Sequence, residues 1–337
     1  MKAKNQAVKI LGGACAMVVL ILDAETALRG SAEGIELCIR SVIPALFPFL
    51  ICSVYLTGNL GNMPIQILAP IGRLCRIPPG SEGILLTGFL GGYPVGAQAV
   101  TQAYEAGSLG QEDALRMLGF CSNPGPAFLF GMLTPHFKYA HIPWILWGIQ
   151  LLSAITVGVI LPGGSNHQTT CVPGNGITIP QALHHAVRTM ATICGWVIAF
   201  RTIHLFVDRW FLWMLPPAAG VFLSGFLELT NGCVNLGTVE SESLRFLMAA
   251  LFLSAGGLCV GMQTISMTRD LGTGWYFPGK LLQTGISGLL CSLILPLLYP
   301  GSSTPWLTPC FLGITLLMLY SFRIRKNNSS NFQLHGV

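Results

Sequence analysis

The sequence carries very little charge. Asp, Glu, Lys and Arg make up 9% of its 337 residues, whereas they make up about a quarter of a soluble domain. Hydrophobic residues make up 52%, and the mean hydropathy is +0.64. This scarcity of charge argues against a soluble protein and predicts an all-α polytopic membrane protein.

Motifs for metals, disulfide frameworks and nucleic acids are also lacking. The eleven cysteines are scattered without a Cys-x-x-Cys pair. His184 and His185 are adjacent, so on a helix their side chains would point about 100° apart. The net charge of +5 lies largely in loops and the tail rather than in a basic patch. We therefore expect no metal, no cofactor and no nucleic-acid partner, with the cysteines acting as small apolar residues.

Long apolar segments, by contrast, are abundant. About eight of them have the ~17–25 residues with which a helix crosses a bilayer: 8–24, 38–60, 115–134, 142–162, 187–207, 243–267, 280–299 and 304–322. We interpret the first as a retained transmembrane helix, because the residues that follow it form a poor signal-peptide cleavage site. Residues 1–337 are thus predicted to be one membrane domain, ending in a disordered polar tail at 323–337.

Two shorter apolar segments, 82–104 and 211–237, have a glycine-rich or polar break at the centre. A helix of about eleven residues rises only about 16 Å, half the hydrocarbon thickness. Each segment therefore fits a re-entrant helical hairpin that enters and leaves the membrane on one side.

The charge distribution predicts the orientation. With both termini in the cytoplasm, twelve Lys and Arg residues lie on the cytoplasmic side, Arg116 and Lys280 among them, and five lie outside, as the positive-inside rule requires. The two hairpins then enter from opposite faces. Residues 36–135 and 185–268 become an inverted repeat joined by a cytoplasmic linker at 163–187, an arrangement that many secondary transporters share.

Helix-breaking residues lie inside both repeats. The first repeat contains Gly88-Phe-Leu-Gly-Gly-Tyr-Pro-Val-Gly96 and Phe120-Cys-Ser-Asn-Pro-Gly-Pro-Ala-Phe-Leu-Phe-Gly131. The second contains a weaker copy, Gly225-Phe-Leu-Glu-Leu-Thr-Asn-Gly232 followed by Leu253-Ser-Ala-Gly-Gly-Leu258. Unpaired backbone groups are tolerated in a membrane only where protein or a watery cavity surrounds them. Broken helices of this kind form the substrate sites of transporters.

Three of these motifs carry a family resemblance. Ser41-Val-Ile-Pro-Ala-Leu-Phe-Pro-Phe-Leu50, Gly92-Tyr-Pro-Val-Gly-Ala97 and Ser122-Asn-Pro resemble the sporulation integral membrane protein family of the YlbJ type. That family belongs to a wider group with a nucleoside-recognition ("gate") domain, which is similar to the hairpin core of concentrative nucleoside transporters. The resemblance covers about 36–135 and, more thinly, about 185–265.

The resemblance implies a multi-pass protein of the bacterial cell membrane, or of a forespore membrane, that moves a small polar or anionic metabolite. Dipicolinate is the cargo proposed for the family. By position it implies substrate-binding roles for residues at the hairpin tips and in the broken helices: Tyr93, Ser122, Asn123, Glu228, Thr230, Asn231 and Ser254. Gly91 and Gly92 stand where the nucleoside transporters have a Gln/Glu pair, so a nucleoside cargo is not implied.

Several of these residues also have structural interpretations. A carboxylate inside an apolar segment is a functional hypothesis by default, yet Glu228 would also serve as a helix cap or a partner of Arg201 or Arg245. Arg201 either reaches the outer interface or balances the charge of Glu228 and an anionic substrate. Ser122 and Asn123 either bind substrate or satisfy backbone groups freed by Pro124.

Gly88, Gly92 and Gly96 follow the small-xxx-small pattern of close helix packing. Because Pro94 interrupts this run, we expect the glycines to pack the two arms of one hairpin together.

Two functions of different classes follow. The first is a secondary transporter or facilitator for a small anionic or polar solute, with a proton or sodium ion as the coupling ion. The alternative is a non-transporting scaffold for spore maturation. An intramembrane enzyme is disfavoured, since nucleophilic catalysis needs a partnered base and His204 is the only histidine well inside a predicted span.

Overall fold

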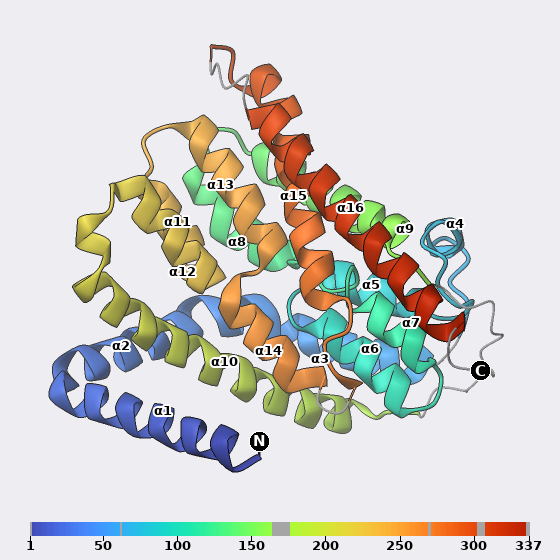
Figure 1. The fold of residues 1–337 in the computed structure, drawn as a ribbon, viewed down its shortest axis with the longest axis horizontal. Helices are drawn as coiled ribbons and strands as arrows, with labels where there is room; N and C mark the ends of the chain where they lie inside the picture. The colour runs from blue at the N-terminus through green and yellow to red at the C-terminus, as the bar shows by residue number, and fades with distance from the viewer. Residues whose placement is uncertain (1, 61–62, 164–175, 269–270, 302–306, 335–337) are drawn as a thin grey trace.

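The computed structural model describes residues 2–60, 63–163, 176–268, 271–301 and 307–334, and side chains at 2–5, 212 and 322–334 are not described. Within these ranges every regular element is helical (Figure 1). The α-helices are α1 Lys2–Leu22, α2 Ala24–Leu37, α3 Ile43–Leu60, α4 Ala69–Leu74, α5 Glu82–Leu90, α6 Val95–Glu105, α7 Gln111–Met117, α8 Pro126–Leu133, α9 Ile142–Ile160, α10 Ile179–Trp210, α11 Pro217–Leu227, α12 Leu229–Asn235, α13 Glu242–Ala255, α14 Gly257–Thr268, α15 Tyr276–Leu298 and α16 Leu307–Leu334. Short 3-10 turns lie at Thr134–His136, Leu212–Met214 and Leu236–Thr238, and a π-helical turn lies at Cys38–Val42.

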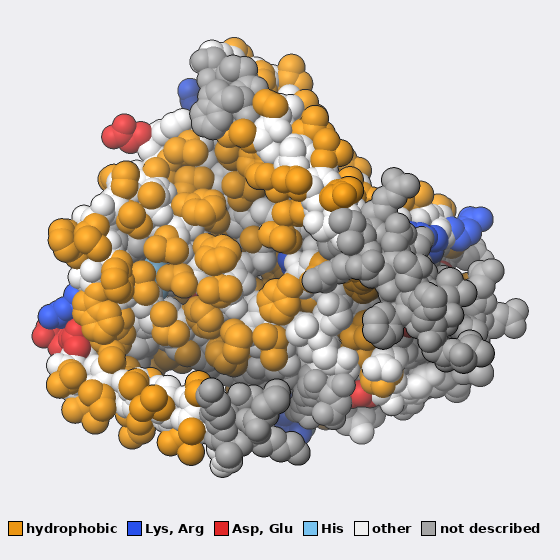
Figure 2. All heavy atoms as spheres, viewed as in Figure 1, with side chains coloured by type: hydrophobic (Ala, Val, Ile, Leu, Met, Phe, Trp, Pro, Cys, Tyr) orange, Lys and Arg blue, Asp and Glu red, His pale blue; other side chains and the backbone are white. Residues whose placement is uncertain are grey.

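Five helical stretches in the described ranges are long and apolar enough to cross a membrane: Ala24–Leu60, Ile142–Ile160, Ile179–Trp210, Glu242–Thr268 and Tyr276–Leu298. Figure 2 shows hydrophobic side chains spread over one face of the molecule, with charged ones at its edge. Large apolar side chains such as Trp213, Phe222 and Phe226 are exposed. A surface of this kind is compatible with a multi-pass membrane protein.

The first long stretch begins earlier than the sequence predicted. We expected a span over 38–60, but α2, the π-helical turn and α3 form one continuous helix from Ala24 to Leu60. The turn precedes Pro44, which has no N–H and crowds the carbonyl four residues before it. The Ile43 N–H instead reaches the Cys38 carbonyl. This widening keeps the backbone paired, as π-turns inside helices do.

The second long helix, α10, packs along α2 and α3. It begins at Ile179, where Thr178 and Gln181 form a capping box that satisfies the first orphan N–H groups. The predicted linker 163–187 is therefore too long at its end, because its last residues are helical. Residues 164–175 of that linker lie outside the described ranges.

Two pairs of short helices occupy the segments predicted as hairpins. α5 and α6 cross where a Cβ on Gly96 would lie 2.9 Å from the Cα of Gly88. α11 and α12 cross in the same way, because a Cβ on Gly232 would lie 2.2 Å from the Cα of Gly225. Gly88 and Gly225 are the glycines of the two Gly-Phe-Leu motifs. Each pair is thus closed by glycine-to-glycine contact between its own two arms.

A broken stretch follows each helix pair. After α7, residues 118–125 leave the helix until Pro126 starts α8. After α13, Gly256 and Gly257 adopt φ of +73° and +76°, a left-handed geometry that only glycine enters freely, and α14 follows. The predicted span 115–134 is therefore two short helices, and it is absent from the five long stretches.

The described apolar helix near the N-terminus covers Gln6–Leu22, two residues earlier than the predicted span 8–24, and another covers Leu307–Ser321, inside the predicted span 304–322. α16 continues to Leu334, into the tail predicted to be disordered.

One arginine has a different role from the one predicted. The orientation argument counted Arg116 among the cytoplasmic charges that flank the spans, but its side chain is buried. Its guanidinium donates to the backbone carbonyls of Cys75, Gly158 and Leu161. These carbonyls lie at the ends of α4 and α9, where helices leave acceptors unpaired. Arg116 therefore joins three elements beside the first helix pair.

Candidate functional site

The loop between α5 and α6 places Tyr93 in the interior. Gly92 has φ of +85°, and a Cβ there would lie 3.0 Å from the backbone nitrogen of Gly125. Only glycine allows this approach without strain. The Tyr93 hydroxyl donates to the carbonyl of Leu253, near the end of α13, at 2.9 Å. The tip of the first helix pair is thereby attached to the end of α13, next to the break at Gly256 and Gly257.

Ser122 and Asn123 lie in the broken stretch between α7 and α8, and both are buried. The Asn123 Nδ2 donates to the Phe120 carbonyl at 2.8 Å, which is the local backbone repair that we considered from the sequence. Its Oδ1 faces the other way and accepts from Gln283 Nε2 at 2.9 Å. The Ser122 hydroxyl is buried without a hydrogen-bond partner. Asn123 therefore serves both its own backbone and a longer polar network.

That network centres on Lys280, which the sequence analysis missed. We counted it as a cytoplasmic charge at the start of a span, but α15 begins at Tyr276, so Lys280 lies a full turn inside the helix. Its side chain is buried, with only 4% of the residue exposed. Its Nζ donates to the Tyr93 hydroxyl at 3.1 Å, to Gln283 Oε1 at 2.6 Å and to the Ser122 carbonyl. The sequence signal that could have identified Lys280 is its position four residues after Tyr276, inside the apolar segment that forms α15.

Gln150 extends the network into α9. Its side-chain Nε2 donates to the carbonyl of Ala250 at 3.1 Å and to the Ser287 hydroxyl at 3.2 Å. Its backbone carbonyl accepts from Gln283 Nε2 at 3.4 Å. Gln150 and Ser287 are fully buried. The network therefore joins both broken stretches to α9 and α15.

Glu228 is the N-cap of α12. Its carboxylate oxygens accept the backbone N–H groups of Thr230 at 3.0 Å and Asn231 at 2.7 Å. This matches the capping role that we weighed from the sequence, and it satisfies two orphan donors of the helix. Glu228 is also buried, and together with Tyr93 and Thr230 it lines a cavity that is described below. The cap therefore holds a carboxylate at the surface of the cavity.

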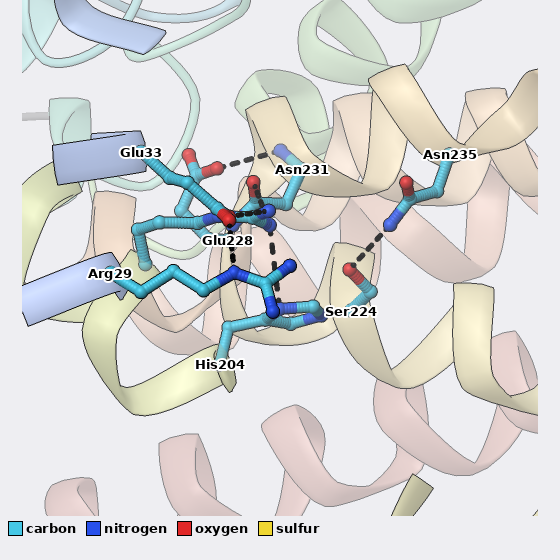
Figure 3. A network of polar contacts seen from close by, with 8 residues as sticks. Arg29, Glu33, His204, Ser224, Glu228, Asn231 and Asn235 are labelled. Carbon is cyan, nitrogen blue, oxygen red and sulfur yellow. Dashed lines mark hydrogen bonds and ion pairs between the residues drawn. The ribbon is translucent and has the colours of Figure 1, made fainter. Parts of the chain in front are cut away.

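Arg201 pairs with a carboxylate other than the one expected. Its Nη2 lies 2.5 Å from Glu33 Oε2 on α2, and its Nη1 donates to Asn231 Oδ1 at 2.9 Å. Neither Arg201 nor Arg245 forms an ion pair with Glu228, since Arg245 donates to the carbonyls of Val239 and His136. The contact between Arg201 and Asn231 still ties α10 to the start of α12. Figure 3 shows Glu33, Glu228 and Asn231 close together in this network.

One cavity of about 30 Å³ lies next to the tip of the first helix pair and the start of α12. From the predicted set, Tyr93, Glu228 and Thr230 line it, and Pro124 and Gly125, which directly follow Asn123, line it too. Ser122, Asn123 and Asn231 are buried behind this lining. Ser254 contributes least, because its hydroxyl donates to the carbonyls of Ala250 and Leu251 in its own helix.

The cavity has a mainly apolar lining in which Tyr93, Glu228, Thr230 and Gln263 are the polar side chains. A volume of about 30 Å³ by this measure exceeds that needed for one water molecule, and a larger solute would require the helices to separate. Away from this lining, Asn231 Nδ2, His204 Nε2 and the Ser122 hydroxyl are buried without hydrogen-bond partners. Buried polar groups without partners are costly. Over the described residues, no three His, Cys, Asp or Glu side chains gather as a metal site.

Comparison of the chain with protein-family models, with curated proteins and with solved structures finds no match. The resemblance to the sporulation membrane proteins therefore stays a prediction from the sequence motifs.

Proposed function

We propose that this protein is a membrane transporter, either a secondary transporter or a facilitator, for a small anionic or polar solute. The observation that carries the proposal is the meeting of two broken helical repeats at one cavity, which Tyr93 from the first and Glu228 from the second both line. Transporters place substrate at such breaks, where backbone groups and helix ends are available to a ligand. Dipicolinate is the candidate cargo that the family resemblance suggests.

The order of elements supports an inverted repeat of about eight spans with two re-entrant hairpins. A long helix (α3), a helix pair (α5 and α6), a broken stretch (α7 and α8) and a span (α9) come first. The same order returns in α10, α11 and α12, α13 and α14, and α15. Both helix pairs close through glycines at their crossings. A duplicated unit explains why four features recur in one order.

The contacts between repeats are reciprocal. α6 packs against α14, and α12 packs against α8. The second arm of each helix pair (α6 or α12) thus packs against the second helix of the other repeat's broken stretch (α14 or α8). The long helices α3 and α10 also contact each other. A two-fold relation between the repeats would produce this exchange of partners. With the axis in the membrane plane, the hairpins would enter from opposite faces and meet near the midplane.

Replacement of Glu228 by glutamine is the test of this function. The amide keeps one acceptor oxygen but turns an N–H donor toward a backbone donor, so it loses one charge-assisted hydrogen bond, about 1.5–3 kcal/mol. The protein is expected to fold, while the rate of solute flux into proteoliposomes, or its pH dependence, changes.

Asn123→Ala is expected to weaken solute affinity more than coupling, since it deprives Gln283 of its acceptor.

Glu240→Gln is the matched control, because Glu240 is exposed between α12 and α13. The flux of this variant should equal that of the wild type. Wild-type flux from both Glu228→Gln and Asn123→Ala would contradict the site. No flux above empty liposomes from folded wild-type protein would favour the scaffold alternative.

A further inference from the structure

Lys280 is a buried cation that the proposed function has not yet used. Over the described residues, the ion pairs involve Arg29, Arg40, Arg201 and Arg209, and none involves Lys280. The oxygens around its ammonium belong to a carbonyl, a phenol and an amide, which carry no net charge. Charged side chains inside a membrane domain are costly and normally face a partner or a pathway. The charge of Lys280 therefore lacks a counter-anion within the described protein.

The three acceptors of Lys280 all belong to the polar network of the site. Tyr93 is the tip of the first helix pair, the Ser122 carbonyl lies in the first broken stretch, and Gln283 also binds Asn123. The Ser122 hydroxyl beside this carbonyl is buried and has no partner. A hydroxyl can donate to a carboxylate, so the region holds a cation together with an unused donor.

Tyr93 connects Lys280 to the cavity. It lines the cavity together with Pro124 and Gly125, and its ring centroid lies 4.9 Å from the Lys280 Nζ. One aromatic side chain thus separates the ammonium from the cavity. In a low-dielectric interior, a charge at this range acts strongly on a ligand. Glu228 lines the cavity too, with its oxygens already bonded to two backbone N–H groups.

We propose that Lys280 supplies the positive charge of this site and that the ligand is a small carboxylate whose anionic end binds at Tyr93 and Lys280, away from Glu228. The proposal rests on the proposed function for its choice of site. It adds the charge class of the ligand and the residue that selects it.

The test is a binding measurement on purified full-length protein, independent of transport. The probes are acetate, benzoate and pyridine-2,6-dicarboxylate, each compared with its neutral amide. The wild type is expected to bind at least one carboxylate about ten- to a hundredfold more tightly than its amide, because the Lys280 ammonium attracts the anion across the Tyr93 ring although its own three N–H donors are already used. Lys280→Met is expected to lose this preference, and Lys280→Arg is expected to restore part of it.

Lys138→Met is the control, because Lys138 is exposed before α9, and its preference should equal that of the wild type. If Lys280→Met does not fold, Tyr93→Phe replaces it, since it removes the hydroxyl that Lys280 contacts while keeping the ring. That variant should lower the preference at least severalfold. Wild-type protein that binds no carboxylate, or an unchanged preference in the folded variant, would overturn the proposal. Carboxylate binding without flux would instead contradict only the proposed function.

Discussion

Gly96→Ala is expected to prevent the protein from reaching its native fold. An alanine Cβ at this position would lie 1.8 Å from the backbone oxygen of Cys121 and 2.9 Å from the Cα of Gly88. Both neighbours are backbone atoms, so no side chain can rotate away. Overpacking of a dense interior costs about 1–3 kcal/mol even where neighbours relax, and here the crossing of α5 and α6 would have to open. Gly232→Ala should behave alike, because its Cβ would lie 2.2 Å from the Cα of Gly225.

Size-exclusion profiles and thermal unfolding in detergent measure this effect. Gly220→Ala is the matched control, since Gly220 lies in α11 and a Cβ there meets nothing within 4 Å. It should behave as the wild type, or be slightly more stable because alanine favours the helix. Wild-type unfolding of Gly96→Ala would show that the glycine crossing does not form.

Arg201→Met is expected to lower the free energy of unfolding by about 3 kcal/mol. The change leaves the Glu33 carboxylate without its partner on α10 and leaves the Asn231 oxygen without its donor. The side chains of Glu33 and Arg201 are only 27% and 21% exposed. Arg29 still pairs with the other Glu33 oxygen at 2.8 Å, but Arg29 is exposed, so the Glu33 carboxylate loses its less exposed partner while it stays largely buried.

The double variant Glu33→Gln with Arg201→Met should therefore be more stable than Arg201→Met alone. Arg40→Met provides the comparison, since Arg40 and its partner Glu36 are 77% and 56% exposed, and such pairs contribute at most about 1 kcal/mol. Equal losses from Arg40→Met and Arg201→Met, measured by chemical unfolding, would contradict this account of the pair.

The sequence predicted the breaks in the helices well because they depend on local chemistry. Gly92 and Pro94, Pro124 and Pro126, and the pair Gly256 and Gly257 mark the bends of the structure. The segment 115–134 was nevertheless predicted as one span, although the stretch with Pro124 and Pro126 separates α7 from α8. Glycines at 88 and 96 were expected to pack two arms together, and they do.

The polar partners were harder to predict, because they depend on the tertiary fold. Glu33 and Arg201 are 168 residues apart in the chain, and Glu33 lies between the predicted spans 8–24 and 38–60. Lys280 was placed at a membrane surface because the predicted span began four residues after the start of α15. Helix ends are the least certain part of a sequence-based assignment. A shift of one turn moved a charge from the surface to the interior.

A cysteine at Val260 tests the central proposal, that a solute crosses the membrane through this cavity, because a transported solute must reach the cavity from both faces. Val260 lines the cavity, is 5% exposed and is close to cysteine in size. In a cysteine-free background, with protein of known orientation in proteoliposomes, a membrane-impermeant maleimide is added from one face or the other. The account predicts labelling from either face, slowed by saturating carboxylate. Folded protein that is labelled from one face only, or from neither, would contradict it.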